Sequence, residues 1–214
     1  QEKKLYEEVD RDYKESQKAK DLIDKIVVSS EFYRVCVAPN DSDFSQTEQE
    51  IVHNLKAFKT PLAIIHAYPI LLAGYTYFYK NGNTSAFKNL VEYTLRFFIR
   101  ARTICVEEPT KLEQFASRIC DMIRSGKTIS DIKIEFRNEQ NSEALVLAKF
   151  KEKTKSTIRR DFFILEKINQ WAYGQINSDL TTLAHSRKSV EHIMPENLTD
   201  EWINDLQKDP TAPT

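Results

Sequence analysis

The sequence predicts a mainly α fold, a multi-helix bundle, and three observations support this prediction. Only 4 glycines and 7 prolines occur in 214 residues, too few for the many tight turns of an all-β fold. Apolar residues recur at three- and four-residue steps along most of the chain, as on one face of a helix. With 41% hydrophobic and 11% aromatic residues, the chain can also bury a sizeable core.

Apolar spacing and capping residues predict where the first helices lie. We expect an amphipathic helix from Leu5 to Val27, with its pattern resuming at Phe32. Ser45 or Thr47 should cap a second helix. Thr60–Pro61 has the sequence of a cap followed by the first turn of a third helix.

The later helices have similar signals. Pro69 should kink or restart the third helix, because proline has no N–H to donate. Residues 128–140 fit a short strand or a helical turn, and both alternatives stay open. The other expected boundaries are a stop at Asn81–Gly82–Asn83 with a cap at Thr84 or Ser85, a helix from Pro109 to Ser125–Gly126, a helix opened by Ser142–Glu143, and a helix from Ser156 to Tyr173.

The bulk properties predict a soluble, cytoplasmic protein with no membrane partner. The N-terminus is charged and is no signal peptide, and Pro61–Tyr79 is expected to be a buried helix pair rather than a membrane span. Three widely spaced cysteines, Cys36, Cys105 and Cys120, predict buried reduced thiols. The formal charge is −1, so any contact with nucleic acid must come from a local patch.

The segment Glu191–His192–Ile193–Met194–Pro195 carries the most specific chemistry in the chain. A histidine can take a proton from water, and an adjacent carboxylate can hold a divalent cation that stabilises the charge on an attacked phosphodiester. Neighbouring residues on a strand point to opposite faces, so both side chains reach one site only where a strand ends. Pro195 fits such an end, since it stops ladder pairing.

The surrounding sequence resembles a known family. The run Ser189–Asn197, followed by Trp202, is similar to the start of the HNH (ββα-metal) domain in GmrSD-type restriction endonucleases. These bacterial phage-defence proteins join an N-terminal ParB-like nucleotide-dependent domain, a helical middle region and a C-terminal HNH nuclease domain. Two further stretches resemble the middle region, namely 67–72 with 90–92 and 98–102, and 159–168.

This resemblance implies a domain layout and roles for individual residues. Residues 1–175 would be the helical middle domain, 176–189 a linker, and 190–214 an incomplete, truncated start of the HNH domain. His192 would be the general base and Glu191 a ligand for Mg²⁺ or Mn²⁺ in the full-length parent. The later Asn and second metal ligand of the site are missing here, so we expect this fragment to bind no metal and to be inactive in isolation. The parent's partners would be DNA and the N-terminal nucleotide-dependent domain, on the same or a partner chain.

A basic stretch leads toward the histidine motif. It could bind the phosphates of DNA, or it could be a solvated helix face balanced by acids. The candidate DNA-binding residues are Lys149, Lys151, Lys153, Lys155, Arg159, Arg160, Arg187 and Lys188. An alternative function is a helical protein-interaction or DNA-recognition module with no catalytic role.

Structural roles are expected for other conspicuous residues. Arg96 should pair with Glu92 one turn earlier. His53 and His66 have no partner at metal-ligand spacing and should be ordinary surface or core histidines. The aromatic residues expected in the core and its interfaces, rather than in a base-stacking surface, are Tyr68, Tyr75, Tyr77, Phe78 and Tyr79.

Overall fold

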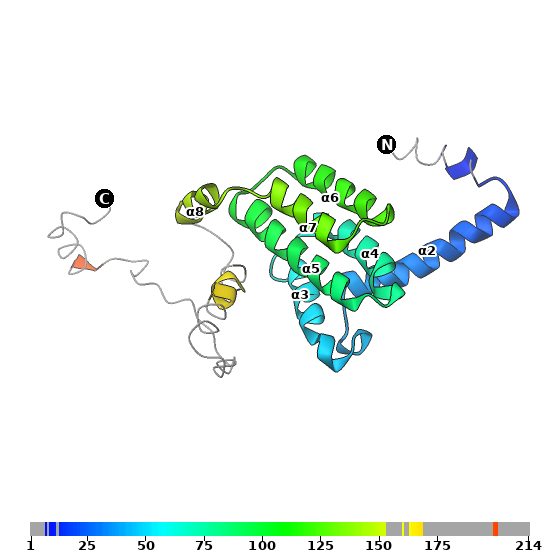
Figure 1. Ribbon diagram of the computed structural model, residues 1–214, viewed down its shortest axis with the longest axis horizontal. Helices are drawn as coiled ribbons and strands as arrows, with labels where there is room; N and C mark the ends of the chain where they lie inside the picture. The colour runs from blue at the N-terminus through cyan, green and yellow to red at the C-terminus, as the bar shows by residue number, and fades with distance from the viewer. Residues whose placement is uncertain are drawn as a thin grey trace. The chain divides into compact units, whose positions relative to one another are not determined.

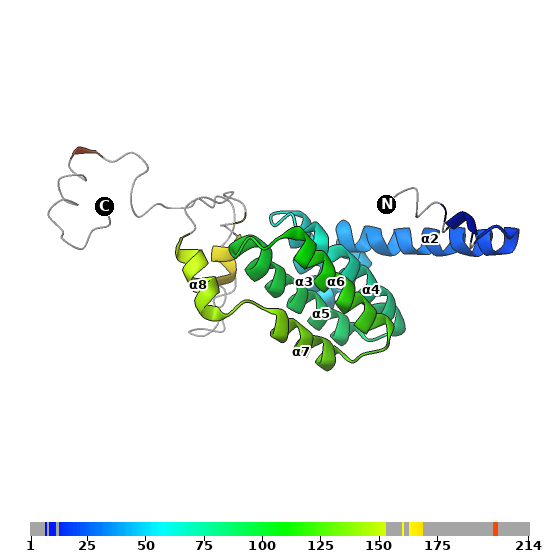
Figure 2. The ribbon, with the colours of Figure 1, turned by 90° about the horizontal axis from the view of Figure 1, so that it is seen from above.

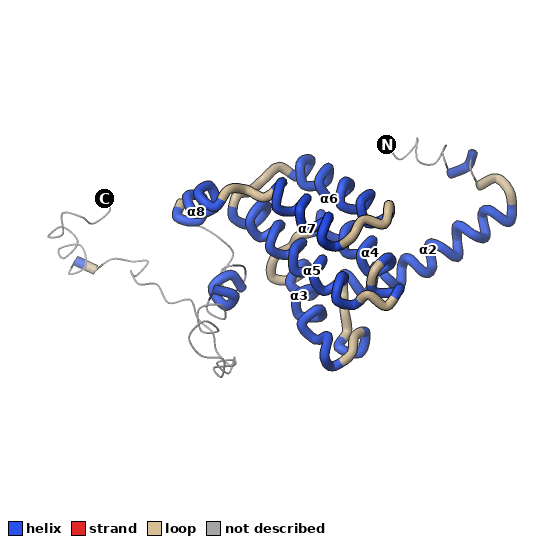
Figure 3. Tube along the Cα trace, in the orientation of Figure 1, coloured by secondary structure: helices blue, strands red, loops and turns tan. Residues whose placement is uncertain are grey.

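The computed structural model describes residue 7 and residues 9–11, 13–152, 160, 163–168 and 199–200. The chain divides into two compact units, Gln1–Arg159 and Arg160–Thr214. The regular elements of the described part are helices, which confirms the mainly α prediction (Figure 1; Figure 3). The expected start of an HNH domain, residues 190–214, lies almost entirely outside the described residues.

The first unit contains the bundle, and its elements follow one another with short connections. In chain order they are α2 (Ser16–Val37), η1 (Asp41–Asp43), η2 (Gln46–Glu48), α3 (Gln49–Lys59), η3 (Ile65–Ala67), α4 (Tyr68–Tyr77), η4 (Tyr79–Asn81), α5 (Thr84–Phe98), the π-helix η5 (Ile99–Ile104), α6 (Pro109–Arg124), α7 (Ile129–Glu139) and α8 (Glu143–Lys151).

Two predicted helix boundaries were confirmed. Pro109 stands in the first turn of α6, and Gly126 follows its C-cap with a φ of +77°. Ser142 caps α8, because its hydroxyl accepts a hydrogen bond from the backbone N–H of Leu145.

The predicted first helix was wrong in both its limits and its continuity. After a turn at residues 13–15, α2 begins at Ser16 and runs unbroken through Phe32 to Val37. The interruption in the apolar pattern at Ser29–Ser30 does not end the helix. No glycine or proline occurs there, and the Ser30 hydroxyl donates to the Val27 carbonyl inside the helix at 2.7 Å.

The prediction that Thr60–Pro61 starts a helix was also wrong. Thr60 is instead the C-cap of α3, and the chain then folds back over the end of that helix. The N–H groups of Leu62 and Ile64 donate to carbonyls of α3, and both side chains are buried. The next α-helix, α4, begins at Tyr68 with Pro69 in its first turn, so Pro69 acts at a helix start.

Local hydrogen bonds resolve two further boundaries. Most of residues 128–140 form the helix α7, and its start is fixed by a reciprocal capping box between Thr128, the N-cap, and Asp131. Ile132 and Phe136, four residues apart, are buried, while Ile134 is 55% exposed, which is helical periodicity. The cap of α5 is Asn83 rather than Thr84 or Ser85.

The helix α4 lies at the centre of the first unit and packs against α2, α5 and α6. Figures 1 and 2 show α4, α5, α6 and α7 side by side, with α2 projecting past the bundle. Six of the ten residues of α4 are buried, and they include Gly74. In the described part of the chain no helix has the length and apolar content needed to cross a membrane.

Two aromatic clusters fill the core, one near the N-terminal end of α5 and one near its C-terminal end. In the first, the ring of Tyr75 lies 5.3 Å from Phe32 of α2, 6.2 Å from Phe44 and 5.6 Å from Phe87 of α5. The second cluster joins α5, α6 and α7 through Phe97, Phe115 and Phe136, with Phe97 and Phe115 stacked at 4.1 Å. Edge-to-face and offset contacts of this kind add to the free energy gained from burial.

An ion pair fixes the C-terminal end of α2 to the loop that follows it. Arg34 donates to both carboxylate oxygens of Asp43, at 2.6 and 3.0 Å. The same carboxylate accepts the N–H of Asn40 at 2.7 Å. The Arg34 guanidinium is the main cause that lowers the pKa of the Asp43 carboxyl below its usual value. This end of α2 is therefore held both by Phe32 in the core and by a bidentate pair at the surface.

We predict that Gly74→Ala destabilises the bundle, because a Cβ at this position would lie 2.1 Å from Leu90 Cδ2 of α5. The expected loss is about 1–2 kcal/mol, since overpacking outweighs the better helix propensity of alanine. Urea unfolding should show a lower midpoint at an unchanged slope. The double variant Gly74→Ala, Leu90→Val removes the clashing carbon and should lose less than the two single variants added together. If the loss in the double variant equals the sum of the two single losses, the close approach of Gly74 and Leu90 is contradicted.

Candidate nucleic-acid interface

The structure describes three of the ten residues predicted for catalysis, metal binding and DNA contact. Lys149 and Lys151 lie on α8 in the first unit, and Arg160 lies in the second unit. The remaining predicted residues lie outside the described part of the chain; they are Lys153, Lys155, Arg159, Arg187, Lys188, Glu191 and His192.

The helical conformation of α8 separates the lysines that the sequence placed together. Lys149 and Lys151 are two residues apart, and such residues point to different faces of a helix. Alternate lysines share one face only in an extended strand. The described part of the basic stretch is therefore no continuous basic stripe.

The charge of α8 is also balanced locally. Lys149 donates to Glu152 at 2.9 Å, and this hydrogen bond is the main cause that raises the pKa of Lys149. From Glu143 to Glu152 there are two lysines and two glutamates, so the segment carries no net formal charge. This favours the solvated-face alternative for Lys149, and any net positive patch must depend on basic residues further along the chain.

Apolar side chains, rather than charged ones, dominate the exposed surface of α8. Leu145, Leu147 and Phe150 are all exposed, and none of the residues of α8 is fully buried. The helix packs against η5, the π-helix that continues α5. The position of α8 thus depends on a few specific contacts more than on a hydrophobic core shared with the bundle.

One such contact is a hydrogen bond from Arg100 of η5. Its Nη2 atom donates to the carbonyl of Asn141, directly before the cap of α8, at 2.9 Å. The Arg100 Nε and Asn141 Nδ2 atoms are buried close to this junction without a hydrogen-bond partner. Buried donors without acceptors are uncommon, and π-helical segments are frequent at functional sites.

The backbone after η5 is strained at one residue. Val106 has a φ of +55°, which β-branched residues rarely adopt, and its side chain is exposed. The N–H of Glu107 donates to the carbonyl of Ala101 at 2.9 Å and closes the end of the helix around Val106. This turn could not be predicted from the sequence, because the usual glycine is absent.

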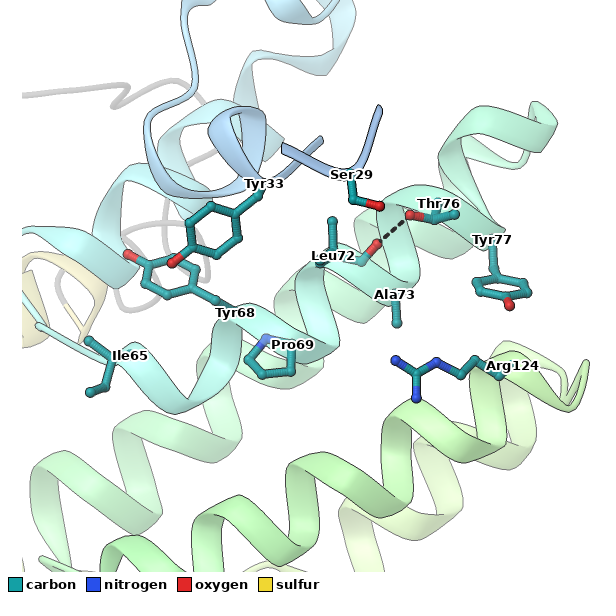
Figure 4. A pocket seen from close by; sticks show the side chains of 10 residues that line it. All are labelled: Ser29, Tyr33, Ile65, Tyr68, Pro69, Leu72, Ala73, Thr76, Tyr77 and Arg124. Carbon is teal, nitrogen blue, oxygen red and sulfur yellow. Dashed lines mark hydrogen bonds between the residues drawn. The ribbon is translucent and has the colours of Figure 1, made fainter. Parts of the chain in front are cut away.

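A groove that the sequence analysis did not identify lies between α2 and α4, with a volume of about 490 Å³ (Figure 4). Ser29 and Tyr33 of α2 form one wall, and Tyr68 and Tyr77 of α4 form the other. The side chain of Arg124 lies at its edge. The groove is lined by hydroxyl groups and apolar surface, and Arg124 is the one cation among the described residues that line it.

One predicted structural role was confirmed. Arg96 pairs with Glu92 at 3.3 Å. His66 faces Glu113, with Nδ1 3.5 Å from the carboxylate. Among the described residues, no group of three or more His, Cys, Asp or Glu side chains could hold a metal ion.

The cysteines agree with the prediction in part. All three are free, and Cys36 and Cys120 are buried, but Cys105, at the end of η5, is only partly buried. Burial raises the pKa of the Cys36 thiol to about 12, so this group stays protonated and unreactive at neutral pH.

Comparisons with known proteins do not assign the chain to a family: no family model, curated protein or solved structure matches it. The similarity of residues 189–197 to GmrSD-type endonucleases therefore stays a prediction from the sequence.

We predict that Arg100→Met loosens α8 without unfolding the bundle, because methionine keeps the length of the side chain but cannot donate to Asn141. A hydrogen bond from a charged group contributes about 1.5–3 kcal/mol, so local opening should increase at least tenfold. Hydrogen exchange of the amides of residues 143–151 measures this opening. The control is Arg96→Met, which removes only an exposed pair and should leave α8 unchanged. Equal exchange rates in the two variants would contradict the role of Arg100.

Proposed function

We propose that this chain is the helical part of a metal-dependent DNA endonuclease of the GmrSD type, and that Glu191–His192 begins its HNH site. The observation that carries the proposal is the run Ser189–Asn197 with Trp202. Its position after a helical bundle is consistent with the order of regions in those proteins.

The two residues have the chemistry that phosphodiester cleavage requires. Histidine side chains ordinarily titrate near neutral pH, so an imidazole suits a general base that takes a proton from water. The carboxylate of Glu191 is a hard oxygen donor, the kind that Mg²⁺ and Mn²⁺ prefer. When bound, such a cation stabilises the charge that develops on the phosphate and the leaving oxygen.

These 214 residues supply only part of that site. Asn197 and Asn204 are too close to His192 to come from a following strand and helix. In the proposed parent, other residues would contribute the further Asn and metal ligand. We therefore propose that this chain by itself does not cleave DNA.

Contact with DNA would depend on the basic residues closest to the motif. On α8, Lys149 is paired with Glu152 and Lys151 lies on another face, so both are weak candidates. The stronger candidates are the remaining basic residues, Lys153, Lys155, Arg159, Arg160, Arg187 and Lys188. Each phosphate contact that they make would lower the affinity for DNA as the salt concentration rises. The nucleotide-dependent domain of the parent would be a further partner.

A second candidate function is a helical protein-interaction module without catalysis. The exposed apolar residues of α2, among them Ile23, Ile26 and Val27, favour it. Contiguous apolar surface of this kind usually marks a site of association. The two functions are compatible in one protein, and a cleavage assay tests the first of them.

We predict that the full-length protein cleaves plasmid DNA in Mg²⁺ or Mn²⁺ and that His192→Ala removes this activity. Loss of a general base lowers the rate by about 10²–10⁴-fold. A chelator should abolish cleavage by the native protein. The matched control is His185→Ala, a histidine seven residues earlier in the same polar segment, which should keep full activity.

Two results would contradict the proposal. Cleavage by His192→Ala at the native rate would show that this histidine is not the base. Cleavage by the 214-residue chain alone, lost in His192→Ala, would show that the site is complete within it.

A further inference from the structure

The helix α2 carries an apolar stripe on the side that does not face the bundle. Phe32, Val35 and Cys36 hold α2 against the rest of the unit. On the other side, Ile23 is 58% exposed and Ile26 is 56% exposed. Figures 1 and 2 show α2 projecting past the bundle, and among the described residues none buries these two side chains.

The stripe has the spacing of a helix-pairing seam. Its members follow steps of four, three, four and three residues; they are Ala19, Ile23, Ile26, Ser30 and Tyr33. This heptad spacing keeps the side chains in line along a partner helix. The stripe is continued at one edge by the groove, since Tyr33 belongs to both (Figure 4).

We propose that α2 pairs antiparallel with α2 of a second copy of this chain. In a symmetric antiparallel pair, the residue opposite each position is fixed by the residue on the two-fold axis. With Ile26 at the axis, Ala19 lies opposite Tyr33, and Leu22 lies opposite Ser30. Small residues thus face large ones along the stripe, which allows the two helices to approach closely.

The charges beside the stripe are complementary in the same register. Lys20 and Glu31 are eleven residues apart, which is three helical turns, so they lie on the same flank. In the antiparallel pair each Lys20 lies beside Glu31 of the other copy, and the contact is made twice. In a parallel pair opposite flanks would meet, so Lys20 and Glu31, which share one flank, would not lie beside each other.

The other lysines of this part of α2 do not oppose the pairing. Lys18 and Lys25 precede Phe32 by two heptads and one heptad, so they lie on the flank of Phe32, which contacts Tyr75 in the core. Lys18 is also paired with Glu15 at 3.3 Å. Both ammonium groups are thereby turned away from the stripe.

The groove supplies space for the second copy. Leu22 lies on the same flank of α2 as Ser29, one of the residues that line the groove. In an antiparallel pair equivalent flanks meet, so Leu22 of the second copy lies over the groove beside Tyr33. Stripe and groove together form one self-complementary surface, and its use does not depend on the nuclease assignment.

Sedimentation equilibrium of the 214-residue chain tests the pairing. We expect a reversible dimer at chain concentrations up to roughly 100 µM, the range of weak but specific contacts. Ile26→Lys puts two like charges at the two-fold axis and should give a monomer with unchanged helix content. The matched control is Leu147→Lys on α8, with 55% exposure of the native side chain, which should still dimerise. A monomeric native chain, or a dimer that persists in Ile26→Lys, overturns the proposal.

A charge-exchange series tests the direction of the helices. Lys20→Glu and Glu31→Lys should each raise the dimer dissociation constant about tenfold, because each creates two like-charge contacts. The double variant Lys20→Glu, Glu31→Lys should restore the native value. If the double variant is as weak as the single ones, or if neither single change has an effect, the antiparallel register is wrong.

Discussion

The close approach of α4 and α5 at Gly74 is the constraint on which the rest of the first unit depends. A glycine here lets Leu90 of α5 lie against the backbone of α4. This contact places Phe87 next to Tyr75, and Tyr75 in turn reaches Phe32 of α2. A helix with buried neighbours on three sides must be apolar around most of its circumference, and α4 is. The apolar sequence of α4 thus suits a helix at the centre of the bundle.

With α4 at the centre, α2 and α8 lie at the margin of the bundle. Part of α2 extends past the bundle, and α8 is held mainly through η5 and Arg100. Both helices expose apolar residues, for example Ile26 and Leu147. Two surfaces available for association are therefore on α2 and α8, while the chemistry proposed for Glu191 and His192 lies further along the chain.

Local signals predicted some of these features and missed others for physical reasons. Pro109 and Ser142 act through their own backbone and side-chain hydrogen bonds, so their roles could be predicted from the sequence. The path after Thr60 could not, because it depends on the burial of Leu62 and Ile64 by distant residues. The apolar residues of α2 were recognised as a helix face, but spacing alone does not tell a core face from an exposed one.

The candidate site likewise has features that could be predicted from the sequence and features that could not. Glu191–His192 was found from residue types alone, and its assignment stays a prediction. The pairing of Lys149 with Glu152 could have been expected from their three-residue spacing on a helix. The junction of Arg100 with Asn141 could not, since 41 residues separate the two in sequence.

Native-state hydrogen exchange tests the central role of α4 most directly. Amides of residues 70–77 should exchange only through global unfolding, and those of 17–27 through local opening. Exchange of residues 70–77 through a partial opening that leaves α6 protected would contradict it.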